Sequence, residues 1–116
     1  MTIKHSLDIA DELFVERRSQ VEEKGYDEDH DDGHRDGSIA SAAATYAFYA
    51  STSGWRDGRL MDSSVFVSVF RWLWPSSWNF KARPRRRCLI IAGALIIAEI
   101  ERIDRESKQS TPQGGS

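Results

Sequence analysis

The sequence predicts a small all-α protein, on two observations. Apolar residues recur at three- and four-residue spacing in three long segments, which is the pattern of helices that bury one face. No segment alternates apolar and polar side chains convincingly enough for a half-buried strand. A chain of 116 residues, 40% of them hydrophobic, also has the size and composition of one domain. We therefore expect a compact bundle of three principal helices within residues 1–106, followed by a flexible, disordered polar tail over 107–116.

The first helix is expected over residues 6–24. Ser6 can cap its amino end, and Gly25 can end it because glycine enters the left-handed backbone conformation without a side-chain penalty. The apolar spacing predicts its buried face, which comprises Leu7, Ala10, Phe14, Arg17 and Val21, widened by Ile9 and Leu13.

The second helix is expected over residues 37–50, with Asp36 or Ser38 as its cap. It is rich in alanine, which is the best helix former and lets a neighbouring helix approach closely. The predicted packing face comprises Ile39, Ala42, Ala43, Tyr46 and either Tyr49 or Ala50.

Two further helices are expected in the second half of the chain. Residues 63–73 are rich in β-branched and aromatic side chains, but an isolated strand would have no partner, so a short helix ending before Pro75 is favoured. Residues 84–106 form the third principal helix. They are apolar almost all round from Cys88 to Ala98, which predicts that this helix is central and the most buried.

The charges are segregated along the chain, although the net charge is only −2. Residues 22–36 are strongly acidic, whereas residues 81–87 carry five basic side chains and no acid. Arginines at the start of a helix are disfavoured by the helix dipole, so an anionic group is expected beside them. We predict that the acidic loop and the arginine cluster face each other, at least in part.

Several protein classes are excluded by composition. The single cysteine, Cys88, rules out an intrachain disulfide, and its place in an apolar run predicts a buried, inert thiol. The amino terminus lacks the apolar segment of a secretory signal, and the longest apolar run is shorter than the roughly 20 residues needed to span a bilayer. We expect a soluble, cytoplasmic protein without contact to a membrane.

The loop YDEDHDDGHRDG, residues 26–37, carries six carboxylates and two histidines. His30 and His34 have the spacing of a zinc-binding helix, but Gly33 disfavours a helix there. Carboxylates also suit Mg²⁺ or Ca²⁺, and a site with His30, Asp31, His34 and Glu101 as ligands is one alternative. The favoured interpretation is an ordered loop without metal, in which Asp32 and Asp36 cap the second helix.

Paired carboxylates on helices permit a second interpretation, as an enzyme. Glu101 and Asp104, with Glu16, Glu22 and Glu23, are similar to the carboxylates that all-α nucleotide pyrophosphohydrolases use to hold Mg²⁺ against a triphosphate. That interpretation requires the acids of the first helix, the loop and the last helix to meet around one cavity.

A third interpretation is a nucleic-acid-binding module. The basic connector lies near Trp72, Trp74 and Trp78, and such a mixture can contact phosphates and stack on bases. An internal acidic partner for the arginines is favoured over nucleic acid.

The stretches VERRSQVEEKGYDEDHDDGHRDGSIASAAATYA and WPSSWNFKARPRRRCLIIAGALIIAEIERIDR resemble a family of small proteins encoded by tailed phages and prophages. The resemblance covers residues 12–105, with residues 51–72 as a longer insert. One departure is Ser38, where the family often has glutamate after the glycine.

The resemblance implies a phage accessory protein that acts by non-catalytic binding, such as an inhibitor of a CRISPR-type effector or of a nucleotide-signalling defence. A bound nucleotide and an oligomeric state stay open, and the alternative is the Mg²⁺-dependent nucleotide-binding or pyrophosphohydrolase-like enzyme described above. Acidic, aromatic and basic surface groups are the expected contacts to a partner or ligand, namely Asp27, Glu28, Asp29, Asp31, Asp32, His34, Trp74, Trp78, Arg85, Arg86 and Arg87.

Overall fold

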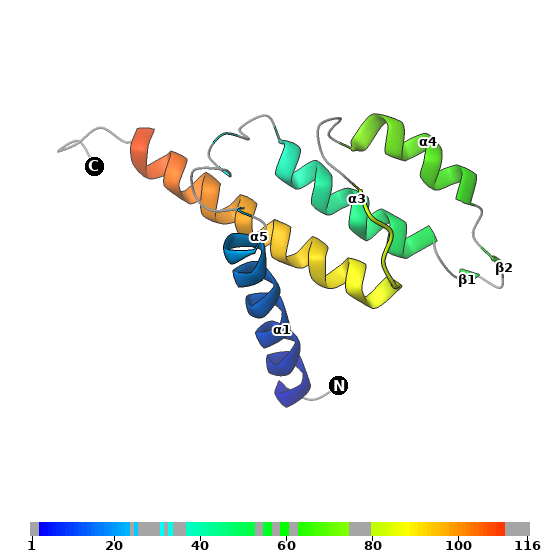
Figure 1. Ribbon diagram of the computed structural model, residues 1–116, viewed down its shortest axis with the longest axis horizontal. Coiled ribbons are helices and arrows are strands. Elements are labelled where there is room, and N and C mark those ends of the chain that lie inside the picture. Colours follow the sequence, from blue (N-terminus) through cyan, green and yellow to red (C-terminus); the bar gives the residue numbers. More distant parts are fainter. Residues whose placement is uncertain are drawn as a thin grey trace.

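A computed structural model describes residues 3–23, 25, 31, 33, 37–52, 55–56, 59–60, 63–74 and 80–110. Its described elements are four helices and a pair of two-residue strands, which confirms the all-α fold with a short fourth helix (Figure 1). The helices are α1 (Ile3–Glu22), α3 (Ser38–Thr52), α4 (Ser63–Leu73) and α5 (Arg85–Ser110). The strands β1 (Trp55–Arg56) and β2 (Arg59–Leu60) pair antiparallel between α3 and α4.

Helix α5 lies at the centre of the fold and contacts both α1 and α3. Helix α3 runs antiparallel to it, and α4 covers the opposite side of α3 (Figure 1). The small side chains of α3 let the two helices approach closely, as expected for an alanine-rich face. The core cluster between them comprises Ile39, Ala42, Ala43, Ile91, Leu95 and Ala98.

Helix α1 crosses α5 at a steep angle and packs on it at Gly93 (Figure 1). A Cβ atom on Gly93 would lie 2.5 Å from Cδ2 of Leu13, so only glycine permits this crossing without a shift. Ile9 and Leu13 are half-buried, and Glu16 and Gln20, on the same side of α1, are buried. The predicted inward face of α1 was therefore partly wrong, because Leu7, Ala10 and Phe14 are exposed.

Aromatic rings join α4 to α3. Phe80, just before α5, contacts the rings of Tyr46, Phe66, Phe70 and Trp74 at centroid distances of 5.1–5.5 Å. Phe66, Phe70 and Trp74 lie at four-residue spacing, which places them on one side of the helix. This ring cluster explains why the β-branched run forms a helix: its aromatic residues find partners on α3, whereas a lone strand would have none.

The helix ends differ from the predicted ones. Helix α1 begins at Ile3, so Ser6 lies inside the first turns and is not its cap. Gly25 has φ = 74°, as expected for the residue that ends α1. Gly37, with φ = 86°, accepts the first hydrogen bond of α3 from Ser41, so Gly37 and not Ser38 is at the capping position. Asp32 and Asp36 lie outside the described residues.

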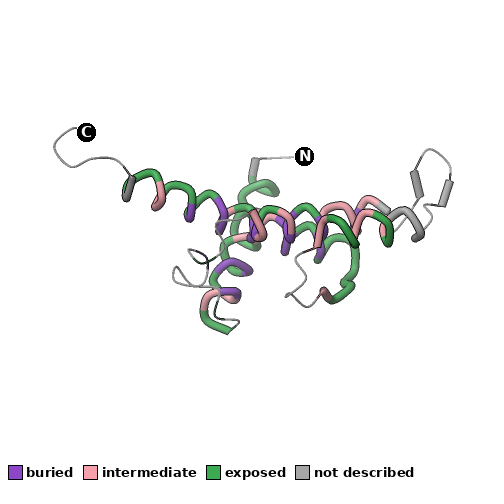
Figure 2. Tube along the Cα trace, turned by 90° about the horizontal axis from the view of Figure 1, so that it is seen from above, coloured by how far each residue is buried: buried purple, intermediate pink, exposed green. Residues whose placement is uncertain are grey.

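Helix α5 begins at Arg85, with the Pro84 carbonyl accepting from the Cys88 amide, and it continues to Ser110. Helix α5 therefore includes residues 107–110, which were predicted to belong to the polar tail, and Lys108 and Gln109 among them are good helix formers. Residues 111–116 lie outside the described residues. Figure 2 shows buried and exposed stretches alternating along α5. One side is exposed, but α5 still carries more of the buried hydrophobic side chains than any other described helix, which confirms the prediction that it is central and the most buried. No helix in the described part of the chain is long and apolar enough to cross a membrane.

Candidate functional site

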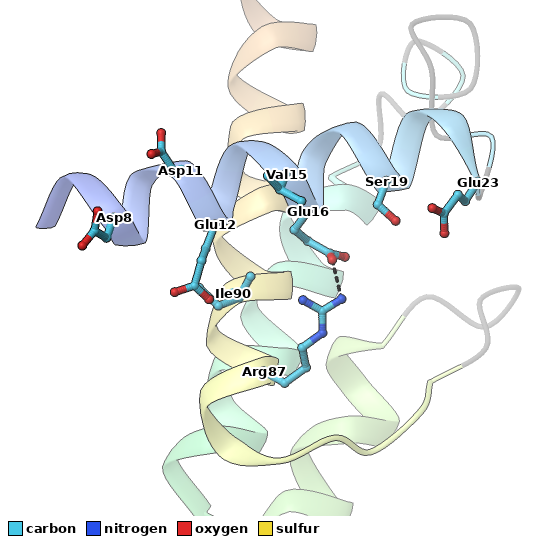
Figure 3. A pocket seen from close by; sticks show the side chains of 9 residues that line it. All are labelled: Asp8, Asp11, Glu12, Val15, Glu16, Ser19, Glu23, Arg87 and Ile90. Carbon is cyan, nitrogen blue, oxygen red and sulfur yellow. Dashed lines mark hydrogen bonds and ion pairs between the residues drawn. The ribbon is translucent and has the colours of Figure 1, made fainter. Parts of the chain in front are cut away.

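An acidic groove of about 460 Å³ runs along one side of α1, above the start of α5 (Figure 3). Carboxylates at three- and four-residue spacing on α1 line one wall, because that spacing repeats on one helix face. Ile90 and Arg87 of α5 line the other wall. We call this the α1 groove, and its lining residues are Asp8, Asp11, Glu12, Val15, Glu16, Ser19, Glu23, Arg87 and Ile90.

Two arginines at the start of α5 pair with acids of the α1 groove. Arg86 donates to both carboxylate oxygens of Glu12, at 2.6 and 2.7 Å, in an exposed bidentate pair. The hydrogen bonds from Arg86 hold the pKa of Glu12 below its ordinary value. Arg87 pairs with Glu16, which is only 3% exposed. The acidic partners that were predicted for the arginines at the start of α5 are thus present. For Arg86 and Arg87 these partners are carboxylates of α1.

Gln20 lies one turn beyond Glu16 and is also buried. Its Nε2 donates to Glu16 Oε2 at 3.5 Å, while its Oε1 is buried and has no hydrogen-bond partner among the described residues. Glu16 is therefore held from two sides, by Gln20 within α1 and by Arg87 from α5.

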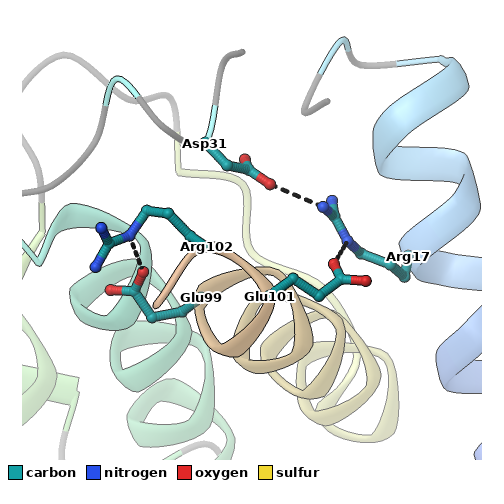
Figure 4. A network of polar contacts seen from close by, with 5 residues as sticks. All are labelled: Arg17, Asp31, Glu99, Glu101 and Arg102. Atoms are coloured by element: carbon teal, nitrogen blue, oxygen red, sulfur yellow. Dashed lines mark hydrogen bonds and ion pairs between the residues drawn. The ribbon is translucent and has the colours of Figure 1, made fainter. Parts of the chain in front are cut away.

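Arg17 joins three parts of the chain (Figure 4). Its Nη2 donates to Asp31 Oδ2 at 2.7 Å, and its Nε donates to Glu101 Oε1 at 3.0 Å. Asp31 is the only residue of the run Asp27–Asp32 that the structure describes. It is 1% exposed and is buried against the guanidinium of Arg17. The loop, α1 and α5 do meet here, as an enzyme would require, but they meet on a positive side chain.

Arg102 forms a separate network within α5. It is buried and donates from Nε to Glu99 (Figure 4). Its Nη1 donates to Glu106 at 2.6 Å. These two hydrogen bonds raise the pKa of Arg102. Because the acids stand three and four residues away on the same helix, the network stiffens α5 without reaching another element.

The other described residues that were predicted to contact a partner, Arg85 and Trp74, make contacts within the chain. Arg85 donates from Nε to the carbonyl of Ala50 at 2.9 Å and so satisfies one of the free carbonyls at the end of α3. Trp74 is half-buried and packs on Tyr46 and Phe70. Six predicted contact residues lie outside the described residues, namely Asp27, Glu28, Asp29, Asp32, His34 and Trp78.

The proposed metal ligands are only partly described. Asp31 and Glu101 lie near each other because both bind Arg17, and His30 and His34 lie outside the described residues. Within the described part of the chain, no three His, Cys, Asp or Glu side chains are arranged to hold an ion. Cys88 is buried and donates to the Arg83 carbonyl, and burial raises the pKa of its thiol, as expected for an inert core cysteine.

The α1 groove itself was not anticipated. A signal for it was present, since Asp8, Asp11 or Glu12, Glu16 and Ser19 follow one another at helical spacing. The apolar residues of the same segment dominated the prediction instead.

Comparison with protein-family models, curated proteins and solved structures found no match to this chain.

Proposed function

We propose that the protein acts by non-catalytic binding of a partner protein, and that the α1 groove receives a basic segment of that partner. The observation that supports this most is the mixture of charges in the groove. Arg86 and Arg87 balance Glu12 and Glu16, whereas no described arginine or lysine forms an ion pair with Asp8, Asp11 or Glu23. These three carboxylates give the groove a surplus of negative charge.

The groove also offers apolar contact. Val15 is 53% exposed and lies among the carboxylates, with Ile90 on the opposite wall (Figure 3). A partner segment with lysine or arginine side chains could place their charged heads at the acids and their aliphatic stems on Val15. Complementary charge of this kind raises association rates and selects between partners.

The resemblance to phage accessory proteins supports a more specific proposal, that the partner is a host anti-phage defence factor. Proteins that bind nucleic acids contact the phosphates through lysine and arginine side chains. An acidic groove competes for the same side chains without undergoing any reaction. The protein would then be an inhibitor that acts in the host cytoplasm.

Affinity capture from a host lysate tests this function. The charge-reversal variant Asp11→Lys reduces the surplus charge, and Glu22→Lys, exposed on the same helix but outside the groove, is a matched control. We expect one host protein to be retained by the wild type and by the control, lost with the groove variant, and released by salt. Retention that is equal on all three baits, or retention of no host protein, would contradict the proposed site.

A Mg²⁺-dependent nucleotide-binding or pyrophosphohydrolase-like enzyme is the second candidate, and one observation favours it. The groove volume of about 460 Å³ lies within the range of small-molecule pockets, roughly 300–1,000 Å³. Its carboxylates Glu16 and Glu23 could hold a cation, and Arg87 could contact a phosphate. Release of pyrophosphate from a nucleoside triphosphate with Mg²⁺, abolished by Glu23→Gln, would establish this function in place of the first.

A further inference from the structure

Arg86 occupies one carboxylate of the α1 groove from within the chain. It donates to both oxygens of Glu12, at 2.6 and 2.7 Å, and Glu12 lines the groove. Glu12 extends from α1 toward the start of α5, beside Ile90 (Figure 3). Two parallel hydrogen bonds from a guanidinium to a carboxylate are also the contact that an arginine of a bound partner would make. A basic side chain of the protein itself therefore already takes one of the acids that a basic segment would use.

The pair between Arg86 and Glu12 is open to exchange because both side chains are exposed. The side chain of Arg86 is 62% exposed, and that of Glu12 is 46% exposed. An exposed ion pair contributes little to stability, since both charges are hydrated again when the pair opens. Arg86 can therefore leave Glu12 while the helices stay folded.

The neighbouring pair between Arg87 and Glu16 lacks this property. The side chain of Glu16 is only 3% exposed, and Gln20 bonds it from within α1. A buried carboxylate that loses its cation is not hydrated again, so opening this pair would be strongly unfavourable. Glu16 consequently belongs to the fold, whereas Glu12 is available to a ligand.

We propose that Arg86 is an internal competitor of the partner, and that an arginine of the bound segment displaces it from Glu12. This inference rests on the proposed function, since it requires that the α1 groove receives a basic segment. Glu12 lies one helical turn from Asp8, so a segment held at Asp8 can reach it. The exchange replaces one bidentate pair with another of the same kind and adds a fourth carboxylate to Asp8, Asp11 and Glu23. A lysine offers a single point charge in place of the planar guanidinium, so arginine is the side chain that fits.

Anisotropy titrations with a short fluorescent oligoarginine peptide at low salt test this proposal. Arg86→Gln frees Glu12 and should bind the peptide about two- to five-fold more tightly than the wild type, which corresponds to the strength of an exposed ion pair. Arg86→Lys keeps the charge but loses the bidentate geometry, so its affinity should lie between the two. Arg71→Gln removes the same charge from an exposed position on α4, and this matched control should bind like the wild type.

The same titrations separate the competitor from the function on which it rests. Binding by the wild type without a gain in Arg86→Gln would overturn the competitor alone. A gain in Arg86→Gln with Arg86→Lys equal to the wild type would also overturn it, because Arg86 would then act through its charge and not by occupying Glu12. An oligolysine peptide that binds the wild type as tightly as oligoarginine would overturn the assignment of arginine. No binding of either peptide by any of the proteins would contradict the proposed function of the groove and the competitor with it.

Discussion

Arg17 is the residue on which α1, the acidic loop and α5 depend for their mutual position. It is 8% exposed, and it bridges buried Asp31 and half-exposed Glu101. A buried carboxylate that loses its cation keeps the full cost of desolvation, whereas an exposed carboxylate regains water. The two halves of this bridge therefore contribute unequally to stability, although their hydrogen bonds have similar lengths.

Replacing Arg17 with methionine should destabilise the fold strongly. We expect a loss of about 3 kcal/mol in the free energy of unfolding, because Asp31 would be left buried without its guanidinium. Glu101→Gln is the matched control and should cost less than about 1 kcal/mol, since its side chain is 49% exposed. Urea unfolding of both variants measures the difference, and equal losses would show that Asp31 does not depend on Arg17.

Glu12 gives the stability a defined pH dependence. Its pKa is lowered from its ordinary value of 4.5 by the hydrogen bonds from Arg86. A lowered pKa in the folded state means that the folded protein binds the proton less readily than the unfolded chain does. The stability that this pair contributes is therefore present above about pH 4.5. It is lost as the pH falls through the lower pKa that Glu12 has in the folded protein.

The variant Arg86→Gln should reveal that dependence. At pH 7 the variant should unfold at a lower urea concentration than the wild type, because it lacks the pair with Glu12. The difference between the two midpoints should shrink as Glu12 is protonated in acid. High salt should reduce the difference at pH 7 as well, because the pair is exposed. A difference that stays constant down to pH 3 would mean that Arg86 acts through packing and not through this carboxylate.

At the scale of the elements, the crossing of α1 over α5 decides which side chains become partners. The helices themselves follow from local pattern: the apolar run Cys88–Ala98 predicts α5, and the alanine run predicts α3. The inward side of α1 does not follow, because Leu7 and Phe14 have the same spacing as core residues and yet face solvent. Only the position of Gly93 opposite Leu13 determines that side, and with it the pairs of Arg86 with Glu12 and of Arg87 with Glu16. A sequence pattern carries no information on such a crossing point.

Substitutions at Gly93 measure how tightly the helices cross. Gly93→Leu should destabilise the protein by roughly 1–3 kcal/mol, because the added side chain overpacks the contact with Leu13. Gly93→Ala should change stability by less, since alanine gains up to about 1 kcal/mol of helix propensity and the nearest atom is the end of a flexible side chain. Thermal unfolding of both variants is the measurement, and Leu13→Ala should relieve the loss in Gly93→Leu. An unaffected Gly93→Leu variant would place α1 elsewhere.

At the scale of the whole molecule, the fold separates two surfaces. The α1 groove collects carboxylates on one side of α1, and a shallow apolar groove between α3 and α5 is lined by alanines together with Ile96 and Ile100. The first surface suits a basic partner. The described carboxylates would then serve recognition and not chemistry.

A calorimetric titration of the purified protein with Mn²⁺ tests most directly the claim that the carboxylates of the α1 groove serve recognition. Paired carboxylates that serve an enzyme must hold a divalent ion, whereas carboxylates that attract basic side chains need not. Our account predicts no stoichiometric binding with the wild type, and the same trace with Glu16→Gln and Glu23→Gln. One tightly bound ion per chain, lost in either variant, would contradict the account and assign the α1 groove to metal-dependent chemistry.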